Sequence, residues 1–427
     1  MVKEFIGIAI IFFFLTGLSL AAQNACVDCH TLVGATKGIV NDWKESKHAL
    51  NKVTCDKCHV EEDKDSISHN GYLITKTPSS SDCARCHPDR VSQFANGKHS
   101  LGWTKMIVAA RYKAIPNDKM RASMCEGCHS IGKVYADGGV GKCDSCHTRH
   151  VFSKVEAKQP EACETCHMGL DHEQIEYYKK SKHGIIQETN RTSSQAPACI
   201  TCHMDGGTHD VSQGITIGTV SQGAFISDKS SGNDYVKDSK GIVMRAITQE
   251  QFDTNRQKML SICERCHSSD FARTTLENAD EIKVQADKKV GEGITIIQGL
   301  YKDGLLDPMP ENRPPNPVTG KNLTLTGQQT YSNTSGIEAE FFETYKYALV
   351  HSWKGAYHMN PDYAHWYGWA QLNLDLEKIK SQDSTLRRIA ALENTTNVKS
   401  TPGFETALAF SGIIVSLILV FRKGERK

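Results

Sequence analysis

The stretch that decides the fold is CEGCHSIGKVYADGGVGKCDSCHTRH, residues 125–150, in which the pattern C-x-x-C-H occurs twice. The same pattern occurs eight times along the 427-residue chain and accounts for all sixteen cysteines. Each second cysteine is followed directly by a histidine, although only 18 residues of the chain are histidine. The cysteine pairs are Cys26/Cys29, Cys55/Cys58, Cys83/Cys86, Cys125/Cys128, Cys143/Cys146, Cys163/Cys166, Cys199/Cys202 and Cys263/Cys266.

The histidine after each pair decides between the known uses of C-x-x-C. Zinc sites, redox dithiols and disulfides all use paired cysteines, but none requires a histidine directly after the second one. In c-type haem attachment, two cysteines bond covalently to the porphyrin and the adjacent histidine binds its iron. We therefore predict eight covalently attached c-type haems, whose irons are held by His30, His59, His87, His129, His147, His167, His203 and His267.

The density of the motifs predicts the fold class. From Cys26 to His267 the chain offers roughly thirty residues per haem, which is too few to bury an apolar core of their own. The haems must then form the core, with short helices and loops around them, and neighbouring haems must lie close together. We expect a mainly α, multihaem cytochrome c fold followed by long C-terminal helices. Two short strands are expected at GITIGTV (214–220) and GITIIQG (293–299).

Both ends of the chain point to export. An apolar run from Phe5 to Leu20 precedes two alanines and predicts a signal peptide at residues 1–22, with a retained N-terminal helix as the alternative. The apolar run from Ala407 to Phe421 ends in basic residues, as membrane anchors do. The triplet at 402–404 (PGF) resembles a C-terminal sorting signal of archaeal surface proteins, which implies lipid replacement of the tail. Either way, the haem domain is expected outside the cytoplasm, on the outer face of the cell membrane.

Composition and proline placement divide the chain further. We expect an octahaem domain at 23–306, a proline-rich loop and linker at 307–335, long helices at 336–396 and the anchor or sorting signal at 402–427. The two long helices are expected at Ile337–His358 and Asp362–Leu392, separated by Pro361. The formal net charge of +1 gives no electrostatic reason to expect a nucleic-acid partner.

One short repeat predicts further iron ligands. WKESKHA (43–49), FANGKHS (94–100) and YKKSKHG (178–184) each place an aromatic residue five positions before a histidine that follows a lysine. We predict that His48, His99 and His183 are sixth ligands of haem irons. The other histidines outside the motifs are His69, His150, His172, His209, His351, His358 and His365. Eight six-coordinate haems would need eight of these ten histidines and an enzyme with one open iron would need seven, so counting leaves both open.

Residues 125–184, together with PDYAHWYGW (361–369), resemble the octahaem hydroxylamine oxidoreductase family, which includes hydrazine dehydrogenase and related nitrite reductases. The resemblance implies that the fourth haem, on Cys125, Cys128 and His129, is catalytic and has an open iron. It also implies that Asp171 and His172 line the open side, with His172 accepting protons, and that the protein is a homotrimer. His172 as a ligand of another haem is the alternative. His209 and Asp210 are a weaker candidate for the same role, and we expect His209, like His69, His150, His351, His358 and His365, to be a ligand.

The resemblance also bears on the direction of the reaction, through two tyrosines in the matching stretch. In oxidative members, a tyrosine from a neighbouring subunit is cross-linked to the catalytic haem, and Tyr363 and Tyr367 lie in the matching stretch. The resemblance thus implies oxidation of hydroxylamine, a small inorganic nitrogen substrate, with electrons passing through seven low-spin haems to a redox partner protein. For Tyr363 and Tyr367, the alternative to a cross-link is that their rings simply pack against haem edges. Nitrite or hydroxylamine reduction, and a non-catalytic electron conduit, are the alternatives for the function.

Overall fold

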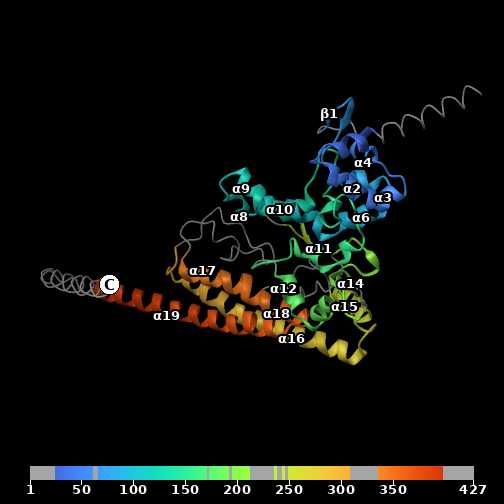
Figure 1. Cartoon of the computed structure of the whole chain (residues 1–427). Coiled ribbons are helices and arrows are strands. Elements are labelled where there is room, and N and C mark those ends of the chain that lie inside the picture. Colours follow the sequence, from blue (N-terminus) through green and yellow to red (C-terminus); the bar gives the residue numbers. More distant parts are fainter. Residues whose placement is uncertain are drawn as a thin grey trace, which may run out of the picture.

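The computed structural model describes residues 25–60, 66–170, 173–191, 195–211, 235–237, 243–245, 249–307 and 335–397. The expected class is confirmed, since the described residues are mainly helical and their strands form only two short antiparallel hairpins. Figure 1 shows two parts, with short helices and loops on one side and a layer of long helices on the other. The predicted signal peptide, the C-terminal tail, the stretch 214–220 and nearly all of the linker lie outside the described residues.

The first part is built from short pieces. Its first hairpin pairs β1 (Ile67–His69) with β2 (Tyr72–Ile74), and a second hairpin further on pairs β3 (Tyr235–Lys237) with β4 (Val243–Arg245). The helices are α2 (Lys37–Glu45), α3 (Lys47–Leu50), α4 (Asp56–His59), α5 (Ser80–Ala84), α6 (Pro88–Asn96), η1 (Lys98–Leu101), α7 (Gly102–Val108), α8 (Ala110–Lys113), α9 (Asp118–Ser123), α10 (Cys125–His129), η2 (Ser130–Gly132), η3 (Cys143–Ser145), η4 (Glu156–Lys158), α11 (Pro160–Glu164), α12 (Gln174–Lys179), α13 (Lys182–Thr189), α14 (Cys199–His203) and η5 (Asp205–Gly207).

Each haem motif folds as about one helical turn. The amide of the motif histidine donates to the carbonyl of the first cysteine, at 2.9 Å for His59 to Cys55, 2.8 Å for His87 to Cys83 and 2.9 Å for His167 to Cys163. Residues three and four apart lie on one face of such a turn. The spacing of C-x-x-C-H therefore presents both sulfurs and the imidazole to the same side.

The second part is a helical bundle with an apolar core. It consists of α15 (Gln249–Cys263), α16 (Ser269–Lys302), α17 (Gly336–Glu343), a π-helical turn η7 (Thr344–Ala348), α18 (Leu349–Tyr357), a second π-helical segment η8 (Tyr363–Ala370) and α19 (Gln371–Asn397). The core includes Val290, Leu300, Phe341, Leu372 and Ile379, none of them measurably exposed. No helix among the described residues combines the length and apolar character needed to span a membrane.

The strand expected at 293–299 is wrong, because these residues lie inside α16. The buried positions of that helix include Val290, Gly293, Ile294, Ile297 and Leu300, a spacing of three and four that belongs to a helix and not to a strand. The two predicted C-terminal helices correspond to the helical runs 336–357 and 361–397. Since α16 packs against α18 and α19, the bundle begins within the range expected for the haem domain.

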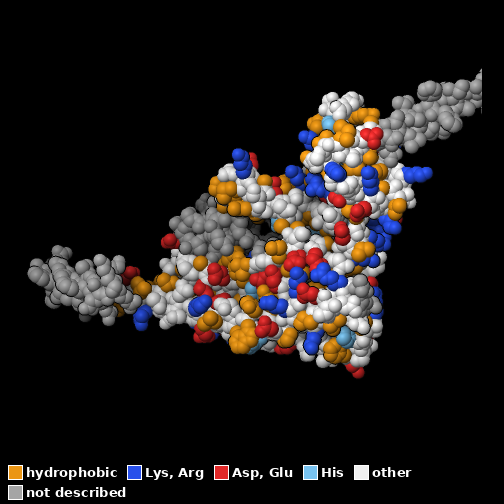
Figure 2. Space-filling model, viewed as in Figure 1, with side chains coloured by type: hydrophobic (Ala, Val, Ile, Leu, Met, Phe, Trp, Pro, Cys, Tyr) orange, Lys and Arg blue, Asp and Glu red, His pale blue; other side chains and the backbone are white. Residues whose placement is uncertain are grey.

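The two parts differ in how much apolar surface they bury. Among the described residues of the range 25–211 the buried hydrophobic side chains are few, namely Val40, Met106, Ile175, Tyr177, Tyr178 and Ala196. Both apolar clusters consist almost entirely of residues after 258. A motif-bearing half without an apolar core fits the expectation that haems form its interior. Figure 2 shows acidic and basic side chains intermixed over the visible face, in keeping with the small net charge.

Candidate functional site

Seven of the eight motif histidines each face a histidine from outside the motifs. The ring centroids of every pair lie 5.9 to 6.4 Å apart. The pairs, in the order of the motifs, are His30 with His69, His59 with His150, His87 with His48, His147 with His209, His167 with His99, His203 with His358, and His267 with His183.

This separation is what a shared iron requires. With a bond of about 2 Å from the metal to each ring nitrogen, imidazoles on opposite sides of one metal have centroids roughly 6 Å apart. All sixteen cysteines are described, and none forms a disulfide, so their sulfurs are available for thioether bonds. The described residues contain no cluster of three or more histidine, cysteine or carboxylate side chains that would bind a metal by themselves. The residues thus fit haem iron between two histidines.

The repeat found at 43–49, 94–100 and 178–184 has a structural reason. The carbonyls of Trp43 and Tyr178 accept both the amide and the hydroxyl of the serine three residues later, and each serine also caps the short helix that carries the histidine. In the middle copy the carbonyl of Phe94 accepts from the amide of Gly97 at 3.0 Å. The resulting turn carries His48, His99 and His183 to their facing motif histidines.

Hydrogen bonds to the outer ring nitrogen orient several of the motif and facing histidines. The Nδ1 atoms of His59, His129 and His358 lie 2.9, 3.2 and 2.7 Å from the carbonyls of Thr75, Gly102 and Lys354. His167 Nδ1 lies 3.3 Å from the side-chain oxygen of Gln174. A backbone carbonyl at Nδ1 fixes the tautomer and leaves Nε2 for a metal.

Burial favours the neutral form of several of the paired imidazoles, and the neutral form is the one that binds iron. Desolvation, helped by the facing His167, lowers the pKa of His99 to about 4. Desolvation, with His358 as the next cause, lowers the pKa of His203 to about 4. The pKa of His358 is also lowered by burial.

Contacts between thiols show which haem sites are neighbours. Cys83 is close enough to Cys143 to shift its pKa, and Cys163 is equally close to Cys199. Cys166 of the sixth motif likewise raises the pKa of Cys128 of the fourth. The spatial order of the sites therefore differs from their order in the sequence, with the third beside the fifth and the fourth beside the sixth.

The cysteines that we predict to bond to haem are not all in the interior. The exposed ones are the second cysteines of the first, third, fifth and eighth motifs, namely Cys29, Cys86, Cys146 and Cys266. All four therefore depart from the expectation that the haem sites form the core. Cys29 and Cys266 belong to the terminal motifs of the chain, the first and the eighth.

In each terminal motif the first cysteine faces another motif, which leaves the second cysteine exposed. Burial raises the pKa of the Cys55 thiol, with Cys26 as the next cause, and burial raises the pKa of Cys202 to about 11, with Cys263 as the next cause. Cys26 and Cys263 thus lie toward the second and seventh motifs, while Cys29 and Cys266 are left on the outer side. Attachment at these two cysteines stays a prediction, and such haems would have an edge at the protein surface.

The remaining histidines of the chain are His129, His172, His351 and His365. His351, which we expected to be an iron ligand, instead places Nε2 at 2.9 Å from a carboxylate oxygen of Glu173. His365, also expected to be a ligand, packs its ring edge-on against Trp366 at 4.6 Å. Asp171 and His172 lie outside the described residues, and Glu173 follows them directly.

A buried polar and aromatic cluster surrounds Glu173 and His351. Tyr177 of α12 stacks edge-on against Tyr363 at 4.7 Å and lies 6.2 Å from the ring of His351. Asn360 ties α12 to the end of α18, donating to the Tyr177 carbonyl at 2.9 Å and accepting from the Tyr363 amide at 3.1 Å. Sequence reasoning missed Glu173, Tyr177 and Asn360. The only signal was the acidic residue directly after Asp171 and His172.

The two candidate tyrosines have different surroundings. Tyr363 is 6% exposed, stacks on Tyr367 at 4.5 Å and hydrogen bonds with Glu173. Burial, with the nearby Glu173 carboxylate as the next cause, raises the pKa of Tyr363, so its hydroxyl stays protonated at neutral pH. Tyr367 is 48% exposed. Tyr363 is therefore held within its own chain, whereas Tyr367 faces outward.

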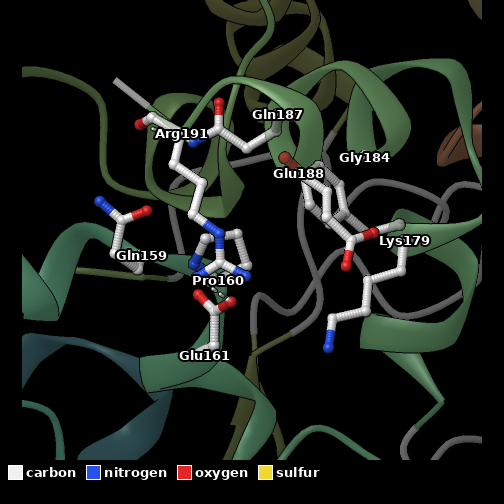
Figure 3. A pocket seen from close by; sticks show the side chains of 9 residues that line it. Gln159, Pro160, Glu161, Lys179, Gly184, Gln187, Glu188 and Arg191 are labelled. Atoms are coloured by element: carbon white, nitrogen blue, oxygen red, sulfur yellow. Dashed lines mark hydrogen bonds and ion pairs between the residues drawn. The ribbon is translucent and has the colours of Figure 1, made fainter. Parts of the chain in front are cut away.

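A small surface pocket between α11 and α13 lies apart from the paired histidines (Figure 3). Arg191 reaches Glu161 across it at 2.8 Å, and Lys179 pairs with Glu164 at 2.7 Å on α11. These exposed ion pairs link α11, which carries Cys163, to the segment around His183. We regard the pocket as part of the scaffold of the sixth and eighth haem sites.

Comparison with known proteins places this geometry in a family. Residues 22–314 match the family model described as "Seven times multi-haem cytochrome CxxCH", and this chain has one such motif more than that description counts. A curated relative from Kuenenia stuttgartiensis, "Probable nitrite reductase-hydroxylamine oxidoreductase fusion protein", is 29% identical over 471 aligned residues. That alignment covers 86% of this chain and 52% of the relative, so the chain spans about half the relative's length.

Solved structures share the architecture. A chain of the "reducing HAO-like protein complex" of Kuenenia stuttgartiensis is 26% identical, with a TM-score of 0.68 and coverage of 88% of both chains. A structure described as a hypothetical multiheme protein shares the fold at 20% identity, with a TM-score of 0.69 and coverage of 87% of this chain and 96% of that one. The motifs, the paired histidines and the family match agree: the chain belongs to the multihaem cytochromes with repeated CxxCH motifs.

Proposed function

We propose that this multihaem cytochrome is an octahaem reductase of small inorganic nitrogen compounds, nitrite or hydroxylamine, acting at an open iron on the fourth haem. One observation carries the proposal: the seven histidine pairs use His48, His69, His99, His150, His183, His209 and His358, and none of them needs His172. His172 is then available, with Asp171, for the catalytic role that the family resemblance gives this pair. The position of His209 opposite His147 supports a ligand role for His209, which disfavours its competing role with Asp210.

The residues divide the work between electron transfer and proton transfer. Haem iron, when bound, supplies the redox change and a place for the nitrogen compound. The paired histidines would hold seven irons from two sides and would so exclude substrate from them. Asp171 would orient His172, which would donate protons to the substrate. The overall balance for hydroxylamine is NH2OH + 2 e⁻ + 3 H⁺ → NH4⁺ + H2O, with electrons from an external low-potential donor protein.

The reducing direction is favoured by two observations. The structurally similar Kuenenia protein is described as reducing and matches over 88% of both chains. Tyr363 is buried in its own chain beside Glu173, which does not suit a residue that must reach a neighbour's haem. Hydroxylamine oxidation is the second candidate, and the half-exposed Tyr367 favours it, since a neighbouring subunit could be reached from there.

The setting of the protein is also part of the proposal. Covalent haem attachment and the terminal sequences favour a location outside the cytoplasm, on the outer face of the membrane and attached through the C-terminal tail. The family resemblance favours a homotrimer.

The decisive experiment is an assay of the purified holoprotein with reduced viologen as electron donor and nitrite or hydroxylamine as substrate. We expect ammonium as product, and we expect His172→Ala to abolish most turnover while all low-spin haem signals remain. A His172→Ala variant that instead gains a second high-spin haem would identify His172 as a ligand. Wild-type protein that oxidises hydroxylamine but produces no ammonium would assign the oxidative direction.

A further inference from the structure

A charged pair and a tyrosine lie beside the seventh and eighth haem sites. Arg256 of α15 donates through Nη2 to Oδ1 of Asp280 in α16 at 2.7 Å, and the Tyr357 hydroxyl donates to the same oxygen. The Arg256 side chain is 13% exposed, that of Asp280 is 36% exposed, and Tyr357 is buried. None of the three is a motif cysteine or a paired histidine, so haem binding alone does not account for them.

This network borders an apolar cluster that also holds cysteines of both haem sites. The buried members of the cluster include Met259, Leu276 and Tyr357, and Cys202 of the seventh motif and Cys263 of the eighth pack against it. Tyr357 therefore belongs both to the cluster and to the hydrogen-bonded network. A charge beside such apolar surroundings acts more strongly on its neighbours than a charge in water, because little solvent screens it.

Helix α15 brings the Arg256 charge to the eighth haem site. Cys263 follows Arg256 by seven residues, which is about two turns, so both lie on the same face of the helix and about 10 Å apart along its axis. Burial raises the pKa of the Cys263 thiol, and Arg256 is among the groups that oppose this rise. The field of the guanidinium therefore reaches the sulfur that would bond to the haem.

The other end of the network reaches the seventh haem site. Tyr357 directly precedes His358, whose ring faces that of His203 at 6.4 Å. Burial, with the hydrogen bond to Asp280 as the next cause, raises the pKa of Tyr357, so its hydroxyl stays protonated and donates at neutral pH. The Asp280 carboxylate thus accepts from one cation and one neutral donor, and its negative charge balances the positive charge of Arg256.

We propose that Arg256 and Asp280 set the reduction potential of the eighth haem as an opposed pair of charges. Oxidised haem iron carries one more positive charge than reduced iron. The Arg256 cation therefore favours the reduced form and raises the potential, whereas the Asp280 carboxylate favours the oxidised form and lowers it. Neither residue touches substrate. The proposal concerns the electron path, rests on haem at the eighth motif, and holds for either direction of the nitrogen chemistry.

The test is a redox titration of the holoprotein without substrate, followed by haem absorbance and electron paramagnetic resonance. Asp280→Asn should raise one haem potential and Arg256→Gln should lower it, each by about tenfold in the reduction equilibrium constant, or about 59 mV for one electron. The double variant should return close to the wild-type potential, which a packing defect would not do. Repeating the titration with His183→Ala, which should make the eighth haem high spin, identifies the haem that shifts.

A second arginine–aspartate pair beside the same two haem sites supplies the matched control. Arg265, within the eighth motif, donates to Asp205, close after the seventh, at 2.8 and 2.7 Å, but these side chains are 52% and 42% exposed. Solvent and salt screen such a pair. Arg265→Gln and Asp205→Asn should therefore produce smaller shifts that disappear at high salt, while the shifts of Arg256→Gln and Asp280→Asn remain.

Shifts of Arg256→Gln and Asp280→Asn in the same direction, or no larger than those of the control pair, would show that the network is only structural. An eighth motif without haem would also overturn the proposal. Should Asp280→Asn bind fewer haems than wild type, Arg256→Gln is compared with Arg256→Lys, which keeps the charge and should match wild type. Wild-type protein that produces no ammonium would contradict the proposed function and leave these potentials as expected.

Discussion

A serine or glycine three residues after an aromatic residue turns the chain at three places and carries a histidine to a haem motif. We predict that His48→Ala, His99→Ala and His183→Ala each convert one low-spin haem to high spin, because each removes one of two axial ligands. Electron paramagnetic resonance of the oxidised variants, with haem content measured in parallel, checks this. An unchanged low-spin count in all three would refute the assignment.

Gly184 shows why the residue after the repeat histidine is small. A Cβ at this position would lie 2.0 Å from the carbonyl oxygen of Tyr178. We therefore expect Gly184→Ala to displace the turn, destabilise the protein by about 1–3 kcal/mol and raise the high-spin content of the eighth haem. Gly38→Ala is the control, since nothing lies within 4 Å of its Cβ and alanine favours helix. Thermal unfolding followed by haem absorbance compares the two. Equal stability of both variants would contradict this reason.

At the residue scale, the sequence predicted ligands where a local signal existed. The histidine after every C-x-x-C pair needed no tertiary information, and the repeat singled out three facing histidines. His69, His150, His209 and His358 share no such pattern, and their partners depend on how distant segments pack. The same is true of Glu173 and His351, which no local pattern joins. His351 and His365 were expected as ligands only because the count of histidines allowed it.

At the scale of elements, a side-chain bridge holds the third haem site to a neighbouring loop. Asp137 accepts hydrogen bonds from the hydroxyls of Ser79 and Ser81 and from the amide of Gly139. Ser79 also caps α5, which carries Cys83. Burial raises the pKa of Asp137, but the hydrogen bonds from the two serines outweigh it, and the net pKa is lowered.

This lowered pKa predicts an acid-sensitive contribution to stability. A carboxyl with a depressed folded pKa stabilises the protein at pH values above its unfolded pKa of about 3.9, and this contribution is lost as pH falls through the folded pKa. We expect Asp137→Asn to lower the free energy of unfolding by about 1 kcal/mol at neutral pH, a value that already allows for solvent screening. In strong acid we expect the substitution to change the free energy of unfolding little. Denaturant unfolding at several pH values measures the difference. A constant difference across the acid range would contradict it.

Element types were predicted well where periodicity and length agreed. The C-terminal helices could be predicted because proline and helical spacing bounded them. The stretch 293–299 was misread because its isoleucines and threonine are β-branched and favour a strand locally, while the burial of α16 against α18 and α19 decides for a helix. The local pattern of GITIIQG was too short to show this.

At the scale of the whole molecule, the motif-bearing part has no apolar core among its described residues, so haem content and folding should be linked. We predict eight covalently bound haems per chain and no reactive thiol in the native holoprotein. Intact-mass measurement and thiol labelling check both statements. A mass that accounts for fewer than eight haems, measured on protein without reactive thiols, would contradict the prediction of eight covalently bound haems.

The labelling experiment has four informative positions. Cys29, Cys86, Cys146 and Cys266 are exposed, so a labelling reagent would reach any of them in the native protein if it were not bonded to haem. Peptide mapping after labelling should therefore find all four unlabelled. A label at one of them would overturn the prediction for that motif and leave the other motifs unaffected.

The last prediction concerns covalent links between chains, and it separates the two directions of the reaction. A tyrosine cross-linked to a neighbour's haem would join two chains permanently, so a covalent oligomer would survive denaturation. Tyr363 is held by Tyr177, Tyr367 and Glu173 of its own chain, which leaves only Tyr367 exposed for such a link. Because we propose reduction, we expect denatured protein to run as a single chain, with both tyrosines unmodified in peptide mapping. Tyr367→Phe should leave ammonium production unchanged. A denaturation-resistant oligomer that Tyr367→Phe abolishes would instead establish the cross-link and favour hydroxylamine oxidation.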